Sequence, residues 1–340
     1  YRGSLSGRFK KKFRTYSSQR FRYFKGVRHV YKMSDLYSVL GISKQAHHRS
    51  FKRAIAMMEL SGVIINECNR IRKNHKVMGC VKIHGQIGKT IGLGRDRFLE
   101  HCKELGLFVK RKRCPYRTTH SSRFRRFPNL SDGLVLTGPN QLWQSDIFYI
   151  HDKDKHRYGF TIIDVYTREL LALRFATNMR AQNLEKAIKE AVKRRAGQNL
   201  SGCVFHSDGG RQYEDLSVIS YLKSMGMQQS MCIRAQQNAY AERVQGTMKY
   251  EYLFLDDSSR SMKQKFYRAM QLYNNSRPHD ELGGLTPTEF QQLTNKTPIN
   301  ERPEMQVYQW IEPVLTFNTE INKRKKNQKR KEQQLHLINN

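Results

Sequence analysis

The order of strand and helix patterns between residues 142 and 255 restricts the fold more than any other feature of this sequence. Three β-rich runs come first and are joined by short turns, which predicts an antiparallel meander. Helices and short strands then alternate, so we predict an α/β domain with a mixed five-stranded sheet. The expected elements are the strands 142–151, 158–164 and 170–175, the helix 183–193, the strand 202–206, the helix 215–225, the strand 228–231 and the helix 238–255.

Three acidic residues occupy special positions on this plan. Asp146 lies in the first strand, Asp208 just past the fourth, and Glu242 one turn into the long helix. Neighbouring strand ends can bring the first two together, and a helix packed across that edge can add the third. Three carboxylates at one point raise one another's pKa unless a cation lies among them. Oxygen ligands suit Mg²⁺ or Mn²⁺, and two such ions about 3.5–4 Å apart hold the attacking and leaving oxygens of an in-line phosphoryl displacement.

The helix around Glu242 carries further polar residues. Asn238, Glu242 and Lys249 stand at i, i+4 and i+11, so we expect all three near one face, directed at a DNA end, with Arg243 as another DNA contact. The alternative is that Glu242 pairs with Arg243 on a solvated helix and that Asp208 only caps the next helix. A fourth carboxylate, Asp164, is better interpreted as structural, bonding to the turn at 166–168.

The net charge selects the class of partner. A formal charge of +33 predicts binding to double-stranded DNA, because Lys and Arg contacts with phosphates release counterions. A membrane surface is disfavoured, since we find neither a long apolar run nor a basic amphipathic helix. The six cysteines show no C-x-x-C pair, which indicates reduced thiols in a cytosolic setting. The chain begins at Tyr1 rather than Met, so we expect a fragment, a processed product or the downstream part of a larger reading frame.

The N-terminal third predicts a DNA-binding region. We expect a basic arm at 1–32, an all-α helix-turn-helix region at 33–109 and a basic linker at 110–138. The first helical pair runs from 33 to about 56 and turns at Gly41; a second unit near 93–107 is either another DNA-reading helix or packing support. A helical hairpin and a solvated tether are the alternatives. The expected DNA contacts are Ser43, Lys44, Gln45, His47, His48, Arg49, Arg53, Lys110, Arg111, Lys112 and Arg113.

Six motifs resemble those of a known family. The chain is similar to transposases of bacterial insertion sequences whose catalytic part is the second reading frame, within the DDE and retroviral-integrase superfamily. The resemblance covers residues 33–313 in family order. The motifs are PNQLWQSD (139–146), IDVYTR (163–168), HSDGGRQY (206–213), NAYAERVQGTMK (238–249), YNNSRPH (273–279) and LTPTEF (285–290).

That resemblance implies a ribonuclease-H-like core at 139–297, followed by a basic tail at 298–340. It also implies a D-D-E site in which Asp146, Asp208 and Glu242 are catalytic and bind two Mg²⁺ or Mn²⁺ ions, with Lys249 contacting the element's end. The implied partners are element-end and target DNA, a second copy of the chain in a dimer or higher multimer, and an upstream-frame protein. The implied location is the bacterial cytoplasm, at the nucleoid.

Two departures from the family pattern accompany this resemblance. Only 33 residues separate Asp208 from Glu242, which is fewer than usual and shortens the loop at 232–237. Gly209-Gly210 also replaces the usual charged residue and Gly.

From the resemblance we expect a transposase, a two-metal-ion polynucleotidyl transferase that binds terminal inverted repeats, cleaves at the 3′ ends and joins them to target DNA. The alternative is a catalytically decayed or regulatory relative that only occupies the ends. A nuclease of RNA–DNA hybrids with the same core is disfavoured by the N-terminal region.

Overall fold

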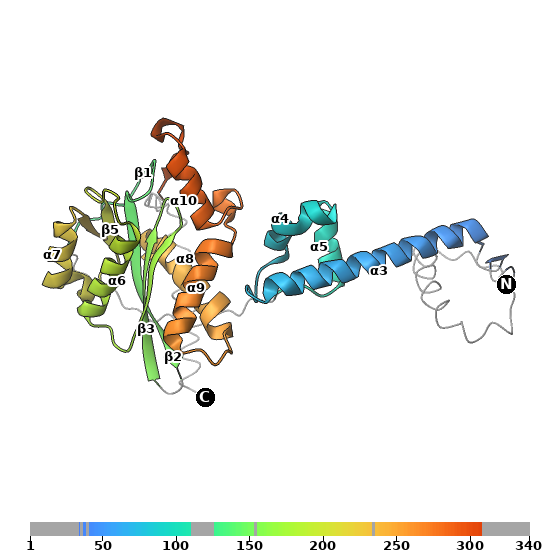
Figure 1. Ribbon diagram of the computed structural model, residues 1–340, viewed down its shortest axis with the longest axis horizontal. Helices are drawn as coiled ribbons and strands as arrows, with labels where there is room; N and C mark the ends of the chain where they lie inside the picture. The colour runs from blue at the N-terminus through green and yellow to red at the C-terminus, as the bar shows by residue number, and fades with distance from the viewer. Residues whose placement is uncertain are drawn as a thin grey trace, which may run out of the picture. The chain divides into compact units, whose positions relative to one another are not determined.

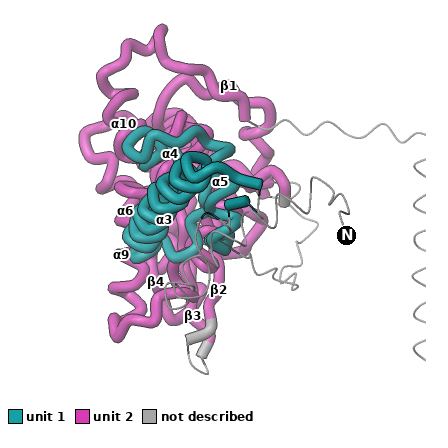
Figure 2. Tube along the Cα trace, turned by 90° about the vertical axis from the view of Figure 1, so that its right-hand side faces the viewer, with its two compact units in different colours: residues 1–115 teal, residues 116–340 magenta. Residues whose placement is uncertain are grey.

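The computed structural model describes residues 34, 37–38, 41–109, 126–152, 155–232 and 235–307 (Figure 1). The chain divides into two compact units, residues 1–115 and 116–340, which Figure 2 colours separately. The predicted basic arm lies outside the described residues. So do the predicted DNA contacts Lys110, Arg111, Lys112 and Arg113.

The described part of the N-terminal unit contains the helices α3 (Lys44–Arg72), α4 (Cys80–Ile91) and α5 (Arg95–Glu104). Ser43, a predicted DNA contact, caps α3: its hydroxyl accepts a bond from Ala46 N at 3.0 Å. The helix then continues well past the predicted end near residue 56. Its C-terminal half packs against α4 and α5 around a core that includes Ile64, Cys68, Ile83, Phe98 and Cys102.

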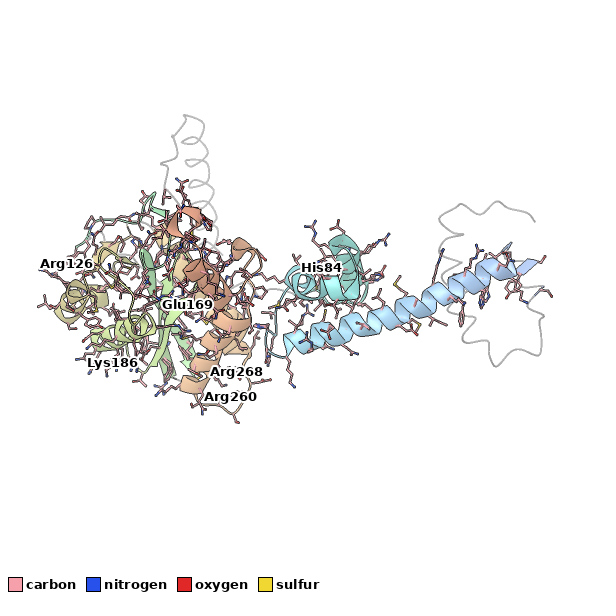
Figure 3. The ribbon with its side chains drawn as sticks, turned by 45° about the horizontal axis from the view of Figure 1, so that its top comes forward. His84, Arg126, Glu169, Lys186, Arg260 and Arg268 are labelled. Atoms are coloured by element: carbon pink, nitrogen blue, oxygen red, sulfur yellow. The ribbon has the colours of Figure 1, made fainter. Side chains whose placement is uncertain are left out.

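Helices α4 and α5 form a pair. Of the two, only α5 was predicted from the sequence. Gly92, in the left-handed conformation at φ 69°, ends α4, and Gly94 precedes α5. The turn between them is closed by His84, labelled in Figure 3, whose Nε2 donates to Leu93 O at 2.9 Å. Helices α4 and α5 therefore form a second helix–turn–helix arrangement, which packs with α3 around the core of the N-terminal unit.

The second unit contains the predicted mixed sheet, in the order β4-β3-β2-β5-β6. Its first three strands pair antiparallel, and β5 and β6 run parallel to β2. The expected ribonuclease-H-like architecture is confirmed by this order and by the helices between the strands. The strands are β2 (Leu142–Asp152), β3 (Lys155–Asp164), β4 (Leu170–Ala176), β5 (Val204–Ser207) and β6 (Gln228–Met231).

Helices cover both faces of the sheet (Figure 1). On one face, α6 (Ala181–Arg194) and α7 (Leu216–Ser224) bury a core with Trp143 and Phe205. On the other, α8 (Ala239–Thr247) and α9 (Met262–Ser276) pack on Phe148 and Ile163. The strand period of two explains why odd and even residues of β2 enter different cores.

The predicted long helix at 238–255 has the right extent but changes geometry. After α8 the chain forms a π-helical turn, Met248–Tyr252, and then a 3₁₀ turn, Leu253–Leu255. Lys249 therefore lies on the π-helical turn rather than on the regular α-helix that carries Glu242.

Two further helices follow the last element predicted from the sequence. Helix α9 reaches Ser276, and α10 spans Pro287–Lys296. Both helices begin with a capping box, formed by Ser261 with Gln264 and by Thr286 with Glu289. Within the described ranges, no helix is both long and apolar enough to cross a membrane.

Segments on either side of the predicted core pack onto it. Strand β1 (Val135–Leu136), from the predicted linker, pairs with β7 (Met305–Gln306), from the predicted tail. Met231 N also donates to Pro128 O at 3.1 Å, and Leu130 N donates to Ser230 Oγ at 2.8 Å. The packed second unit therefore includes described residues from 126 to 307.

Asp164 has the structural role predicted for it. The side chain is fully buried and accepts bonds from Asn140 N at 2.7 Å and from Thr167 N at 3.0 Å. Arg195 lies 3.5 Å from Asp164 and 2.8 Å from Glu169, which is labelled in Figure 3. This buried network ties the β3–β4 turn to the end of α6.

Candidate active site

The parallel register of β2 and β5 brings Asp146 and Asp208 together. Ser145 pairs with Ser207, so Asp146 and Asp208 are the next residues of adjacent strands. Asp146 is 9% exposed, and its Oδ1 accepts a bond from Ile147 N at 2.8 Å. Both carboxylates therefore lie at one edge of the sheet, as predicted.

Asp208 begins a tight turn. Its Oδ1 accepts a bond from Gly210 N at 3.2 Å, and a Cβ added at Gly210 would lie 3.1 Å from that oxygen. Helix α7 takes its cap from Asp215 instead, whose side chain accepts from Ser217 N at 3.0 Å. Asp208 thus stabilises its own turn without being the cap of α7.

Glu242 lies in the first turn of α8, as predicted, and its side chain is exposed. Asn238 precedes this helix and is 2% exposed; its amide donates to Ser145 O at 2.9 Å. The expected DNA-facing position of Asn238 is therefore corrected, because the side chain is buried against β2. Arg243 is exposed, and its contact with DNA stays a prediction.

The three carboxylates influence one another's charge. The pKa of Asp146 is raised to about 7. Burial and then the charge of Asp208 are the largest causes, and Glu242 adds to the rise, whereas the Ile147 amide and Lys249 oppose it. Partial desolvation and then Asp208 raise the pKa of Glu242. The three groups therefore form one electrostatically connected cluster.

The donor chemistry of this cluster fits a hard divalent cation. Among the described residues, no three His, Cys, Asp or Glu side chains already stand together as a ready set of metal ligands. Yet Asp146 is nine-tenths buried beside two other carboxylates, which a cation would compensate. Oxygen donors of this kind are the ligands that Mg²⁺ and Mn²⁺ prefer.

Tyr213 is a site residue that the sequence analysis missed. It is fully buried, and its hydroxyl lies 3.0 Å from Ser145 Oγ, so the turn after Asp208 is tied to the strand that carries Asp146. The signal for it was the aromatic residue that ends the motif HSDGGRQY, five residues after Asp208.

Lys249 lies on the π-helical turn beside the site. Its Nζ is 5.4 Å from the ring centre of Phe148 and 5.3 Å from that of Tyr149, and its charge lowers the pKa of Asp146. Glu251 of the same turn accepts a bond from Arg277 Nη2 at 3.0 Å. The turn thus places a cation near the carboxylates, and a contact of Lys249 with DNA stays a prediction.

The candidate DNA contacts of the N-terminal unit share the first turns of α3. Ser43 uses its hydroxyl as the helix cap, and His47 Nδ1 lies 3.2 Å from the Tyr37 hydroxyl. The remaining residues repeat at i, i+4 spacing on adjacent rows of the helix and are exposed. They are Lys44, Gln45, His48, Arg49 and Arg53.

Replacing Asp146 with Asn should stabilise the metal-free protein at pH 8 by about 1–3 kcal/mol. The pKa of Asp146 is raised from 3.8 to about 7 in the folded chain, so the folded state binds the extra proton between these values. Stability therefore falls as pH rises through this window, and the full cost of the charge is present above pH 7. Urea unfolding with chelator, followed by tryptophan fluorescence, measures the difference.

The same comparison at pH 4 should show a smaller gain, because Asp146 is then protonated in the folded state of the unchanged protein. Asp215→Asn is the matched control, since this carboxylate is exposed and caps α7. Equal gains at pH 4 and pH 8 would contradict the raised pKa.

Known families match the same part of the chain. Sequence models of the family described as "Integrase core domain" match residues 137–237 and 227–287. The 31 kDa protein of insertion element IS600 from Shigella sonnei is 32% identical, over 59% of this chain and 75% of that protein. The putative transposase InsK of IS150 from Escherichia coli is 28% identical, over 61% and 74%. The transposase of IS904 from Lactococcus lactis is 26% identical, over 73% of this chain and all of that protein.

Solved structures show weaker similarity. The HTLV-2 integrase catalytic core in complex with magnesium is 16% identical with a TM-score of 0.37, over 45% of this chain and 97% of that chain. A simian T-cell lymphotropic virus intasome in complex with the PP2A regulatory subunit B56 gamma is 17% identical with a TM-score of 0.42, over 70% and 76%.

Proposed function

Because the chain belongs to the insertion-sequence transposases of the integrase superfamily, we propose that it cleaves the 3′ ends of its element and joins them to target DNA. The observation that carries this proposal is the register of β2 and β5, which places Asp146 beside Asp208, with α8 adding Glu242. Both steps are in-line attacks on a phosphodiester, so one site serves both.

Asp146, Asp208 and Glu242 would hold the divalent ions. When bound, two such ions polarise the phosphodiester and stabilise charge on the attacking and leaving oxygens. The carboxylates supply negative charge at fixed positions, because Asp146 lies in the sheet and Asp208 is held by its turn. Lys249 supplies a cation at the same place, where a DNA phosphate would be bound.

The N-terminal unit would recognise the terminal repeats. Its candidate surface is the exposed basic face of the first turns of α3, and α5 of the α4–α5 pair is a second candidate. Joining two ends to one target calls for at least two copies of the chain, so we propose a dimer or higher multimer on DNA. Its DNA substrates place the reaction in the bacterial cytoplasm, at the nucleoid, where an upstream-frame protein is a further candidate partner.

The test is strand transfer by the purified chain on a labelled duplex that carries the element's ends. We expect joined products with Mg²⁺ or Mn²⁺ and none with chelator. Binding of the ends without joining under any metal would contradict this proposal and would favour the catalytically decayed or regulatory alternative.

A further inference from the structure

The first turn of α8 takes its capping acceptor from another element, strand β2. Asn238 is the N-cap residue of α8, but its side chain makes no capping bond to the helix. Its side-chain amide donates to Ser145 O instead. The amides of Tyr240 and Ala241 donate instead to Gln144 Oε1, at 3.1 and 3.3 Å. Amides of a first helical turn have no partner within the helix. Gln144 thus does, from a neighbouring strand, what an N-cap side chain usually does.

The other end of the Gln144 amide is also engaged. Its Nε2 donates to Gln237 O at 3.1 Å, in the turn that leads into α8. The side chain is fully buried, where a polar group left without partners is costly. Gln144 therefore forms hydrogen bonds both to Gln237, two residues before α8, and to the first turn of the helix.

Gln144 lies two residues before Asp146 in the same strand. Residues i and i+2 of a strand point to the same face of the sheet, so both side chains face the layer that contains α8. Glu242 follows Ala241, whose backbone N–H donates a hydrogen bond to Gln144 Oε1. The cap, the first carboxylate and the third carboxylate are consequently linked through a few covalent and hydrogen bonds.

We propose that Gln144 is a positioning residue that fixes the start of α8, and with it Glu242, relative to Asp146. This inference rests on the proposed function, because it assigns Gln144 to the geometry of the cation site. Without the cap, the first turn of α8 opens and the Glu242 carboxylate no longer holds one position beside the sheet. Outer groups that orient metal ligands typically contribute about 10–100-fold to metal affinity.

Two substitutions separate the cap from simple packing. Gln144→Met keeps the length and approximate volume of the side chain but removes the acceptor oxygen. Gln144→Glu keeps oxygen acceptors for Tyr240 N and Ala241 N and loses the donor to Gln237 O. The matched control is Gln141→Met: Gln141 Oε1 also accepts from two amides, Thr137 N at 2.7 Å and Gly138 N at 3.1 Å.

The measurements are amide hydrogen exchange of the peptide 238–247 and calorimetric binding of Mn²⁺ to the full chain. In Gln144→Met we expect faster exchange in this peptide and Mn²⁺ affinity lower by about tenfold or more. The faster exchange should be reversed in large part in Gln144→Glu, and both exchange and Mn²⁺ affinity should stay unchanged in Gln141→Met. Affinity for the element's ends should be equal in all four proteins.

Unchanged exchange and unchanged Mn²⁺ affinity in a folded Gln144→Met variant would overturn the inference. If that variant does not fold, Gln144→Glu decides at the two amides that it can still accept from: normal protection of Tyr240 N and Ala241 N supports the cap, and faster exchange of these two amides overturns it. Failure of the unchanged protein to bind Mn²⁺ would contradict the proposed function, whereas the exchange data would still decide whether Gln144 holds α8.

Discussion

Replacing Asp146 or Asp208 with Asn, or Glu242 with Gln, should each reduce strand transfer by about 10²–10⁴-fold while leaving binding of the element's ends nearly intact. Each amide keeps the shape of the side chain and removes the charge that would hold the cations. Loss of several kcal/mol of transition-state stabilisation has this effect on rate. Single-turnover joining of labelled ends measures it, and a gel-shift titration measures end binding.

The control for these substitutions is Asp215→Asn, which alters an exposed carboxylate seven residues after Asp208 and should leave joining unchanged. Unfolding does not explain the expected loss at Asp146, because the same Asn should stabilise the metal-free chain. Near-normal strand transfer in any one of the three variants would show that its residue is not a ligand.

Replacing Arg195 with Met should destabilise the second unit by about 3–5 kcal/mol. Arg195 is 3% exposed and lies between two buried carboxylates, Asp164 at 3.5 Å and Glu169 at 2.8 Å. Burial raises the pKa of Asp164, and the charge of Arg195 opposes that rise. Removing the guanidinium leaves a buried carboxylate without its counter-charge, which costs more than the methionine restores by packing.

The sign of the pH dependence follows from the same pKa. Without Arg195, the pKa of Asp164 rises further above its unfolded value, so stability is lost as pH rises through that interval. Urea unfolding at pH 5 and pH 8 measures this, with tryptophan fluorescence as the signal because both tryptophans lie in the second unit. The control is Arg194→Met: Arg194 is 30% exposed and pairs with Glu169 at 2.7 Å, so we expect a cost below about 1 kcal/mol. Equal costs for the two variants would contradict the role of the buried network.

The sheet and the positions of the three carboxylates along the strands and α8 were predictable because they depend on local pattern. Alternation of apolar residues identifies β2 to β4, and the short apolar strand β5 ends directly before Asp208. Strands that neighbour each other in an α/β sheet then bring their ends together. Capping boxes at Ser261 and Thr286 were visible in the sequence and would have identified α9 and α10.

Other features depend on contacts between distant segments. The burial of Asn238 follows from its bond to Ser145 O, 93 residues earlier, and Gln144 caps α8 across a similar separation. The π-helical turn at Met248 keeps the apolar pattern of a helix, so periodicity alone cannot distinguish it from α. Lys249 nonetheless faces β2, as Asn238 does, because its Nζ lies over the rings of Phe148 and Tyr149.

Mn²⁺ binding to the whole 340-residue chain without DNA is the decisive measurement of whether Asp146, Asp208 and Glu242 form one cation site. Calorimetry would compare the unchanged protein with Asp146→Asn, Asp208→Asn and Glu242→Gln. We expect each single substitution to weaken the same binding event, because all three carboxylates hold the same ions. Mn²⁺ binding that persists unchanged in any of the three variants would contradict the account.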